Sequence, residues 1–140
     1  MQKLTIKKPS DYHLHLRDGD VLQHTVMATA ASMGSAVIMP NLVPPVDTVD
    51  RAETYYQAIK ATLPPNHPFT PLMTLYLKES TTLETLIAAA EHPHIIGCKL
   101  YPKGATTNAA QGVHQLLGSA IFAIGCGHTG LSTPGKRDLS

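Results

Sequence analysis

The chain has 140 residues, a length that suggests one domain and at most two. Hydrophobic residues make up 43% and charged residues 15%, against about 25% charged in ordinary globular domains, so a mainly disordered chain is excluded. The formal net charge of +1 argues against a nucleic-acid-binding protein, because such domains carry a clear basic excess. The eight histidines are the compositional excess, and they point to metal or acid–base chemistry.

Cellular location follows from three features of the sequence. Two cysteines are too few for a disulfide scaffold and indicate reduced thiols. No apolar run approaches the roughly 18 residues that span a bilayer. The first twenty residues turn polar too early for a signal peptide. We therefore expect a cytoplasmic protein with neither a membrane nor a nucleic acid as a partner.

Short apolar runs alternate with helix-like stretches over the first hundred residues. Residues 4–7 favour a short edge strand, and residues 12–16 alternate as a strand that ends at Asp18-Gly19-Asp20. Residues 40–45 contain three prolines and predict an ordered loop, since proline fits neither a helix interior nor a strand ladder. The remaining predicted elements are helices over 21–33, from Asp47 or Thr48 to about Leu63, and over 82–92, and strands over 36–39, 71–77 and 95–101.

This alternation of strands and helices predicts an α/β fold with a parallel sheet. Right-handed crossovers put the carboxyl end of every strand on the same side, and in such folds this end carries the functional site. After Val113 the rhythm stops, because glycines and a proline interrupt a short apolar stretch. We therefore expect a folded unit over 1–113 and an irregular tail over 114–140.

The sharpest local motif is His13-Leu14-His15-Leu16-Arg17. In a strand, alternate residues face the same way, so the two histidines and the arginine share one face while the two leucines face a packing layer. Two imidazoles at this spacing can bind one zinc ion, and the arginine offers a fork for a carboxylate. The alternative is a pair of histidines on a solvated strand face.

Lys99 lies close to the carboxyl end of the last predicted strand, on the same face as Tyr101. A buried lysine is costly unless it is deprotonated or paired. The neutral amine can react with carbon dioxide to give a carbamate, an anionic ligand with two oxygens that can bridge two cations. The alternative is a surface lysine whose aliphatic stem covers apolar neighbours. Cys98 alternates with Lys99 and is expected to point into the core.

Asn41 follows a buried strand, where its amide can donate to a carboxylate or serve as an ordinary turn residue. Thr106-Thr107-Asn108 can likewise be turn chemistry alone. We assign a structural or solvent-exposed role to four other histidines: His24, His67, His92 and His94.

Four segments together resemble a known family. DYHLHLRDGD, VIMPNLVPPV, FTPLMTLYL and KLYPKGATTN, in this order and spacing, are similar to bacterial-type dihydroorotases of the amidohydrolase superfamily. The resemblance runs from about Leu4 to Val113. It implies the N-terminal half, about four βα units, of a (β/α)₈ TIM-type barrel, which typically takes about 250 residues.

The resemblance also implies roles for individual residues. His13 and His15 would ligate the more buried of two zinc ions, and Lys99, as its carbamate, would bridge both. His15, Leu16, Arg17 and Asn41 would contact the substrate. The implied reaction is the interconversion of dihydroorotate and N-carbamoyl-L-aspartate in pyrimidine biosynthesis, through hydroxide held between two metals.

The sequence after Val113 departs from the family pattern. The expected histidines of later strands and the aspartate that serves as general base are not found, and His128 lacks the context of a ligand. We therefore expect at most one well-ligated zinc and an inactive, aggregation-prone chain with open sheet edges. The alternatives are a non-catalytic fragment or frame-shifted product, or another cyclic amidase of the hydantoinase or allantoinase type. A homodimer is an arrangement open to the intact family.

Overall fold

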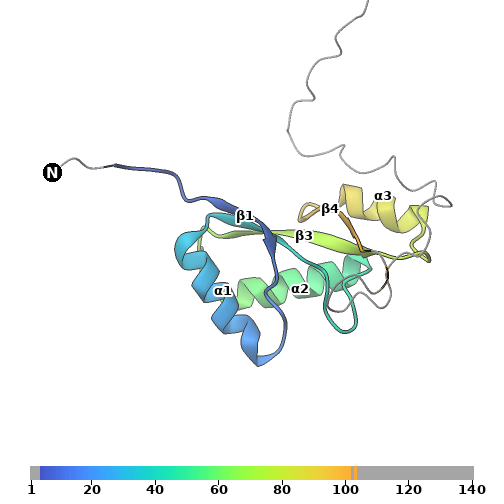
Figure 1. The fold of residues 1–140 in the computed structure, drawn as a ribbon, viewed down its shortest axis with the longest axis horizontal. Helices are drawn as coiled ribbons and strands as arrows, with labels where there is room; N and C mark the ends of the chain where they lie inside the picture. Colours follow the sequence, from blue (N-terminus) through green and yellow to red (C-terminus); the bar gives the residue numbers. More distant parts are fainter. Residues whose placement is uncertain (1–3, 102, 104–140) are drawn as a thin grey trace, which may run out of the picture.

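The computed structural model describes residues 4–101 and 103. Its four strands form one sheet in which neighbours along the chain are neighbours in space and every pair is parallel. The strands are β1 (Ser10–Leu14), β2 (Ser35–Ile38), β3 (Thr70–Leu77) and β4 (Ile95–Leu100). The helices α1 (Asp20–Ser32), α2 (Val49–Ala61) and α3 (Leu83–Glu91) connect them in turn (Figure 1).

This order confirms the predicted parallel α/β arrangement, and each predicted helix is present with ends that differ by one or two residues. The expected edge strand over 4–7 is wrong: these residues are exposed and form no strand. The β propensity of Leu4 and Ile6 is not enough, because neither side chain is covered by another part of the described structure. The predicted tail over 114–140 lies outside the described residues, so its boundary stays a prediction.

Local sequence signals explain where the second and third helices begin. The side chain of Thr48 accepts a hydrogen bond from the backbone N–H of Arg51, which caps α2. Thr82 does the same for the N–H of Thr85 at the start of α3. Each threonine satisfies a donor that the first helical turn leaves without a partner.

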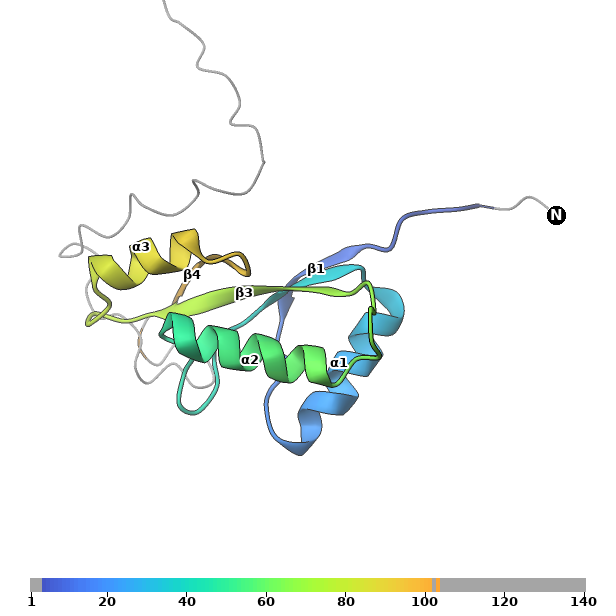
Figure 2. The same ribbon diagram turned by 180° about the vertical axis from the view of Figure 1, so that it is seen from behind.

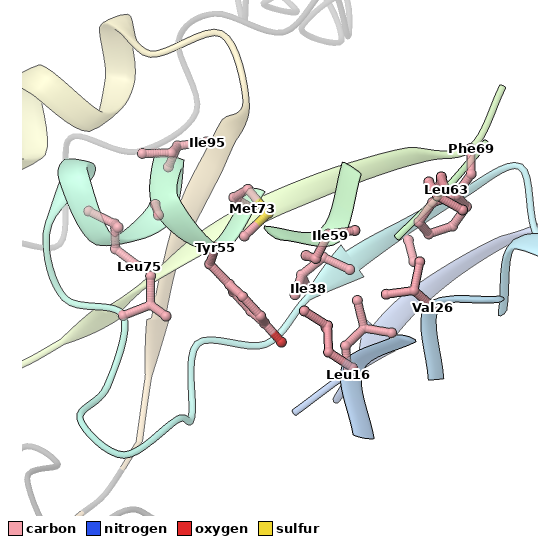
Figure 3. Packing of buried hydrophobic residues seen from close by; sticks show 14 of the residues in the cluster. Leu16, Val26, Ile38, Tyr55, Ile59, Leu63, Phe69, Met73, Leu75 and Ile95 are labelled. Atoms are coloured by element: carbon pink, nitrogen blue, oxygen red, sulfur yellow. The ribbon is translucent and has the colours of Figure 1, made fainter. Parts of the chain in front are cut away.

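One core joins all three helices to the same face of the sheet. Figure 2 shows α2 running along β3, with α1 beyond one end of α2 and α3 on the side of β4. Figure 3 shows side chains from the helices meeting Ile38 of β2 and Met73 and Leu75 of β3. Burying such side chains contributes roughly 1.5–3 kcal/mol each. The opposite face of the sheet therefore has none of the three helices against it and is the face on which ligand-binding groups can gather.

The pairing of β1 with β2 is irregular between Asp11 and Leu14, the stretch that contains His13. Asp11 pairs with Ala36 and Leu14 with Ile38, so β1 uses one residue more than β2 over the same stretch. An extra residue of this kind bends a strand and re-aims its side chains. The predicted strand over 12–16 thus begins and ends two residues earlier, at Ser10 and Leu14.

Among the residues that the structure describes, no helix combines the length and the apolar character that crossing a membrane demands.

Candidate metal and substrate site

The two histidines of the H-x-H motif converge at the carboxyl end of β1. Their Nε2 atoms lie 3.3 Å apart, and their ring centroids are 5.2 Å apart. His13 is exposed and His15 is half-buried. The structure therefore brings the predicted pair together, although His15 lies beyond the last residue of the strand.

The separation of the two nitrogens can be compared with what a metal requires. Two ligands at about 2.0–2.1 Å from a tetrahedral zinc ion lie about 3.3–3.4 Å apart. The observed Nε2–Nε2 distance of 3.3 Å fits this value. The same distance also allows a hydrogen bond between two neutral imidazoles, one of which donates. The donor pair thus has both the chemistry and the spacing for a shared zinc ion.

The electrostatic surroundings of His15 favour its neutral form. Partial burial lowers the pKa of its imidazole below the usual value. Positive charge on Arg17, on His13 and on Lys99 lowers this pKa further. A neutral imidazole is the form that binds a metal ion.

Lys99 faces away from the helices. It pairs with Tyr76 of β3, while its neighbour Cys98 pairs with Leu75, which belongs to the core on the helix face. The predicted opposition of Lys99 and Cys98 is therefore confirmed. The expectation that Cys98 points into the core is wrong, because its side chain is exposed.

Asn41 lies in the loop after β2 and is only 1% exposed. Its Oδ1 accepts a hydrogen bond from the hydroxyl of Tyr101, which also contacts the sulfur of Met39 at 3.6 Å. The ring of Tyr101 stacks on Tyr76 at 5.0 Å, and the Lys99 Nζ lies 6.0 Å from its centroid. Tyr101 therefore connects the asparagine to the lysine, and it orients the amide so that Nδ2 is the donor on its other side.

The loop that carries Asn41 is held at both ends. The carbonyl of Pro40 accepts hydrogen bonds from the backbone N–H groups of Leu42 and Val46. Val46 in turn accepts from the N–H of Tyr76 on β3 at 2.7 Å. Asp47, next in the chain, pairs with Arg51 of α2 and with Lys78 after β3. The predicted proline-rich loop is thus an ordered one.

Leu16 lies between the two polar residues of the site, and its side chain is fully buried in the core. The prediction that this leucine faces a packing layer is confirmed. Only its backbone can meet a ligand on the other side, so a contact between its side chain and substrate does not fit the structure.

Arg17 is exposed, and its backbone has φ of 67°, in the left-handed region that few residues other than glycine adopt. The regular strand alternation that the sequence predicts therefore does not extend to Arg17.

The other predicted histidines lie elsewhere. His24 is exposed on α1, and His67 accepts a hydrogen bond from the N–H of Phe69. The Nε2 of His92 lies 3.3 Å from Glu53, and the His94 ring stacks on Tyr56 at 3.8 Å. Over the described residues no group of three or more histidine, cysteine or acidic side chains is placed to hold a metal. Among the described residues, the histidine pair is the group whose spacing fits a shared metal ion.

The residues that hold this site together are not apparent from the sequence. For Tyr101 the one available signal is its spacing of two residues from Lys99, which predicts that the two share a face. The helix residues that bind the backbone after β1, Thr25 and Tyr55, gave no signal at all. The candidate turn residues 106–108 lie outside the described part of the chain.

No family model matches the chain. Individual curated proteins do. The chain is 58% identical over 116 residues to a dihydroorotase of Idiomarina loihiensis, covering 83% of this chain and 34% of that protein. It is 51% identical over 124 residues to a dihydroorotase of Coxiella burnetii, covering 89% of this chain and 35% of that protein. The chain thus spans about a third of the length of the curated relatives that it matches.

Solved structures agree with the sequence relatives. A dihydroorotase of Campylobacter jejuni matches with a TM-score of 0.70 and 40% identity, covering 77% of this chain and 31% of that one. The dihydroorotase of Saccharomyces cerevisiae in complex with 5-fluoroorotic acid matches with a TM-score of 0.68 and 36% identity, covering 75% and 28%. The chain is therefore homologous to dihydroorotases, and its sheet and helices correspond to the N-terminal part of their barrel.

Proposed function

We propose that this chain carries the N-terminal part of the active site of a dihydroorotase, a cyclic amide hydrolase of pyrimidine biosynthesis. The observation that carries the proposal is the 3.3 Å separation of the His13 and His15 Nε2 atoms, which fits a shared zinc ion. The relatives named dihydroorotase and the 5-fluoroorotic acid complex of the yeast protein support a pyrimidine-ring acid as ligand, rather than a hydantoin.

Each residue of the site has a distinct part in the proposal. His13 and His15 hold one zinc ion, and Lys99, after its amine adds carbon dioxide and loses a proton, provides a carbamate as a third ligand that can bridge to a second zinc ion. Zinc bound there supplies Lewis-acid activation of water and of the ring carbonyl. Arg17 and the Nδ2 group of Asn41 hold the ligand carboxylate by charge and by hydrogen bonding, and His15 and the Leu16 backbone lie against it.

The proposal limits what this chain does alone. Of the proposed zinc ligands, the described residues include one histidine pair and Lys99, while a second metal would require further ligands, and proton transfer a general base. We propose that the 140-residue chain binds at most one zinc ion tightly and does not turn over dihydroorotate. We also propose that the protein is cytoplasmic and that its partner is a small-molecule substrate rather than a nucleic acid or a membrane.

Zinc titration by calorimetry tests the metal site directly. We expect one zinc ion per chain, and a loss of at least about tenfold in affinity for His13→Ala and for His15→Ala. His24→Ala, which removes an exposed imidazole from α1, is the matched control and should bind zinc normally. Equal zinc affinity in all four proteins would overturn the assignment of the histidine pair.

The carbamate has its own readout. In buffer with ¹³C-labelled bicarbonate, the zinc-loaded chain should show a carbamate carbonyl resonance that is lost in Lys99→Ala and retained in Lys7→Ala. Absence of that resonance from the unsubstituted chain would remove Lys99 from the ligand set. Turnover of dihydroorotate by purified chain of verified mass would contradict the proposed lack of activity.

A further inference from the structure

Two hydroxyl groups from the helices hold two consecutive backbone carbonyls directly after β1. The Thr25 Oγ1 of α1 donates to the carbonyl of Leu16 at 2.7 Å. The Tyr55 hydroxyl of α2 donates to the carbonyl of Arg17 at 2.6 Å. Neither contact is local in sequence, and the second joins residues 38 positions apart. The segment between strand and helix is thus held from the core side.

The backbone at Arg17 needs such support. Its φ of 67° is a conformation that residues with a Cβ atom adopt at an energetic cost. Outliers of this kind persist where surrounding contacts determine them, and they cluster at functional sites. The hydrogen bond from Tyr55 is made to the strained residue itself. It is therefore the contact best placed to keep Arg17 in this conformation.

Tyr55 is built into the rigid part of the molecule. It is 5% exposed, and Figure 3 shows its ring among the core side chains with the hydroxyl on the side of Leu16. Burial raises the pKa of this phenol, and the nearby charge of Asp18 raises it further, so the hydroxyl remains a proton donor. A donor carried by a packed aromatic ring fixes the position of its acceptor more firmly than a surface side chain can.

We propose that Tyr55 is a positioning residue for Arg17, holding its peptide in the left-handed conformation that directs the guanidinium toward the ligand carboxylate. The inference rests on the proposed role of Arg17 in that binding.

Tyr55→Phe tests the inference, because phenylalanine keeps the packed ring and removes only the donor. Tyr56→Phe is the matched control: it removes a hydroxyl from the next residue of the same helix, whose ring stacks on His94 away from the site. Both variants and the unsubstituted chain are compared by NMR at Arg17 and by calorimetry with zinc and with dihydroorotate.

We expect the strong intraresidue amide-to-Hα NOE of Arg17, which marks positive φ, to be lost in Tyr55→Phe and retained in Tyr56→Phe. Affinity of the zinc-loaded chain for dihydroorotate should fall about tenfold in Tyr55→Phe, the effect of one lost hydrogen bond of ordinary strength. Zinc affinity should stay within about twofold, because the histidine pair precedes the held peptide. A general loss of structure would lower both affinities.

The outcomes separate the inference from the function on which it rests. If the unsubstituted chain binds dihydroorotate and Tyr55→Phe keeps the NOE or the full affinity, the positioning role is overturned and the proposed function stands. If the unsubstituted chain does not bind dihydroorotate, the proposed function is overturned, and the inference about Arg17 as a carboxylate ligand falls with it.

Discussion

The hydroxyl of Tyr101 donates a hydrogen bond to the side-chain oxygen of Asn41, and both side chains are buried. This contact links the end of β4 to the loop after β2, across the intervening strand β3. Because the amide oxygen faces Tyr101, the amide nitrogen Nδ2 faces the other way and is the donor there. The asparagine is therefore oriented by the protein before any ligand arrives, which is how precise binding sites are usually built.

Tyr101→Phe should lower the free energy of unfolding by about 1–2 kcal/mol, because the buried oxygen of Asn41 loses this donor while the ring packing is kept. Urea unfolding followed by circular dichroism measures the change. Tyr12→Phe is the control, since Tyr12 is 78% exposed and its substitution should change stability by less than about 0.5 kcal/mol. Equal stabilities for the two variants would contradict a structural role for the Tyr101 hydroxyl.

Leu16→Ala should destabilise the chain by about 2–5 kcal/mol, the usual cost of truncating a fully buried leucine. Leu16 is fully buried although both of its neighbours belong to the polar site. Leu4→Ala removes the same atoms from a side chain that is 87% exposed and should be close to neutral. Thermal melts of the two variants make the comparison, and a small effect at Leu16 would mean that the core does not hold this end of β1.

Acid should destabilise the chain partly through Asp47. Burial alone raises the pKa of this carboxyl, but hydrogen bonds and charge from Lys78 and Arg51 outweigh it and lower the pKa below its usual value. A group with a lowered pKa in the folded state stabilises that state above its ordinary pKa and loses this contribution as the pH falls. We expect a decline in stability that begins below about pH 5 and continues through the lowered pKa of Asp47.

Asp47→Asn should lower stability at pH 7 by about 2 kcal/mol and flatten the decline toward acid pH. Asp50→Asn removes an exposed carboxylate from the first turn of the same helix and is expected to cost less than about 1 kcal/mol. Urea midpoints at several pH values provide the data. A variant at Asp47 with the full acid dependence would show that other carboxyl groups cause it.

Thr48→Ala should cost about 1 kcal/mol, because the first turn of α2 loses the oxygen that accepts from the N–H of Arg51. Thr54→Ala, in the middle of the same helix, replaces an exposed threonine by a better helix former and should be neutral or stabilising. Differential scanning calorimetry distinguishes the two, and a loss of equal size at both positions would contradict the capping role.

Much of the fold could be predicted because local signals coincide with the tertiary structure. Thr48 and Thr82 stand where helices begin, and the apolar spacing of Leu22, Val26 and Ala30 matches the buried face of α1. The convergence of His13 and His15 could be predicted for the same reason, since an H-x-H pair requires only one short extended segment.

The features of the fold and the site that could not be predicted depend on contacts between segments far apart in the sequence. The spacing of Leu83, Leu86 and Ile87 predicts that all three lie on one buried face of α3. This is only partly right: Leu86 is buried, but Leu83 and Ile87 are 50% and 46% exposed because no described element covers them. The left-handed backbone at Arg17 depends on a hydroxyl from another helix. Such features arise from the arrangement of elements, so strand alternation holds for His15 and Leu16 but does not predict the backbone at Arg17.

Because of the one-residue irregularity between Asp11 and Leu14, the number of residues in β1 determines the direction of its side chains as much as their identity does. Shifting a strand by one position turns its side chains to the other face of a sheet. A deletion of Tyr12 would regularise the ladder, place His13 opposite Val37 and so change the direction of its imidazole. Chains of this type should therefore tolerate insertions and deletions before Pro9 but not between Asp11 and Leu14. In an alignment of related sequences, gaps should be absent from the segment in which β1 pairs with β2.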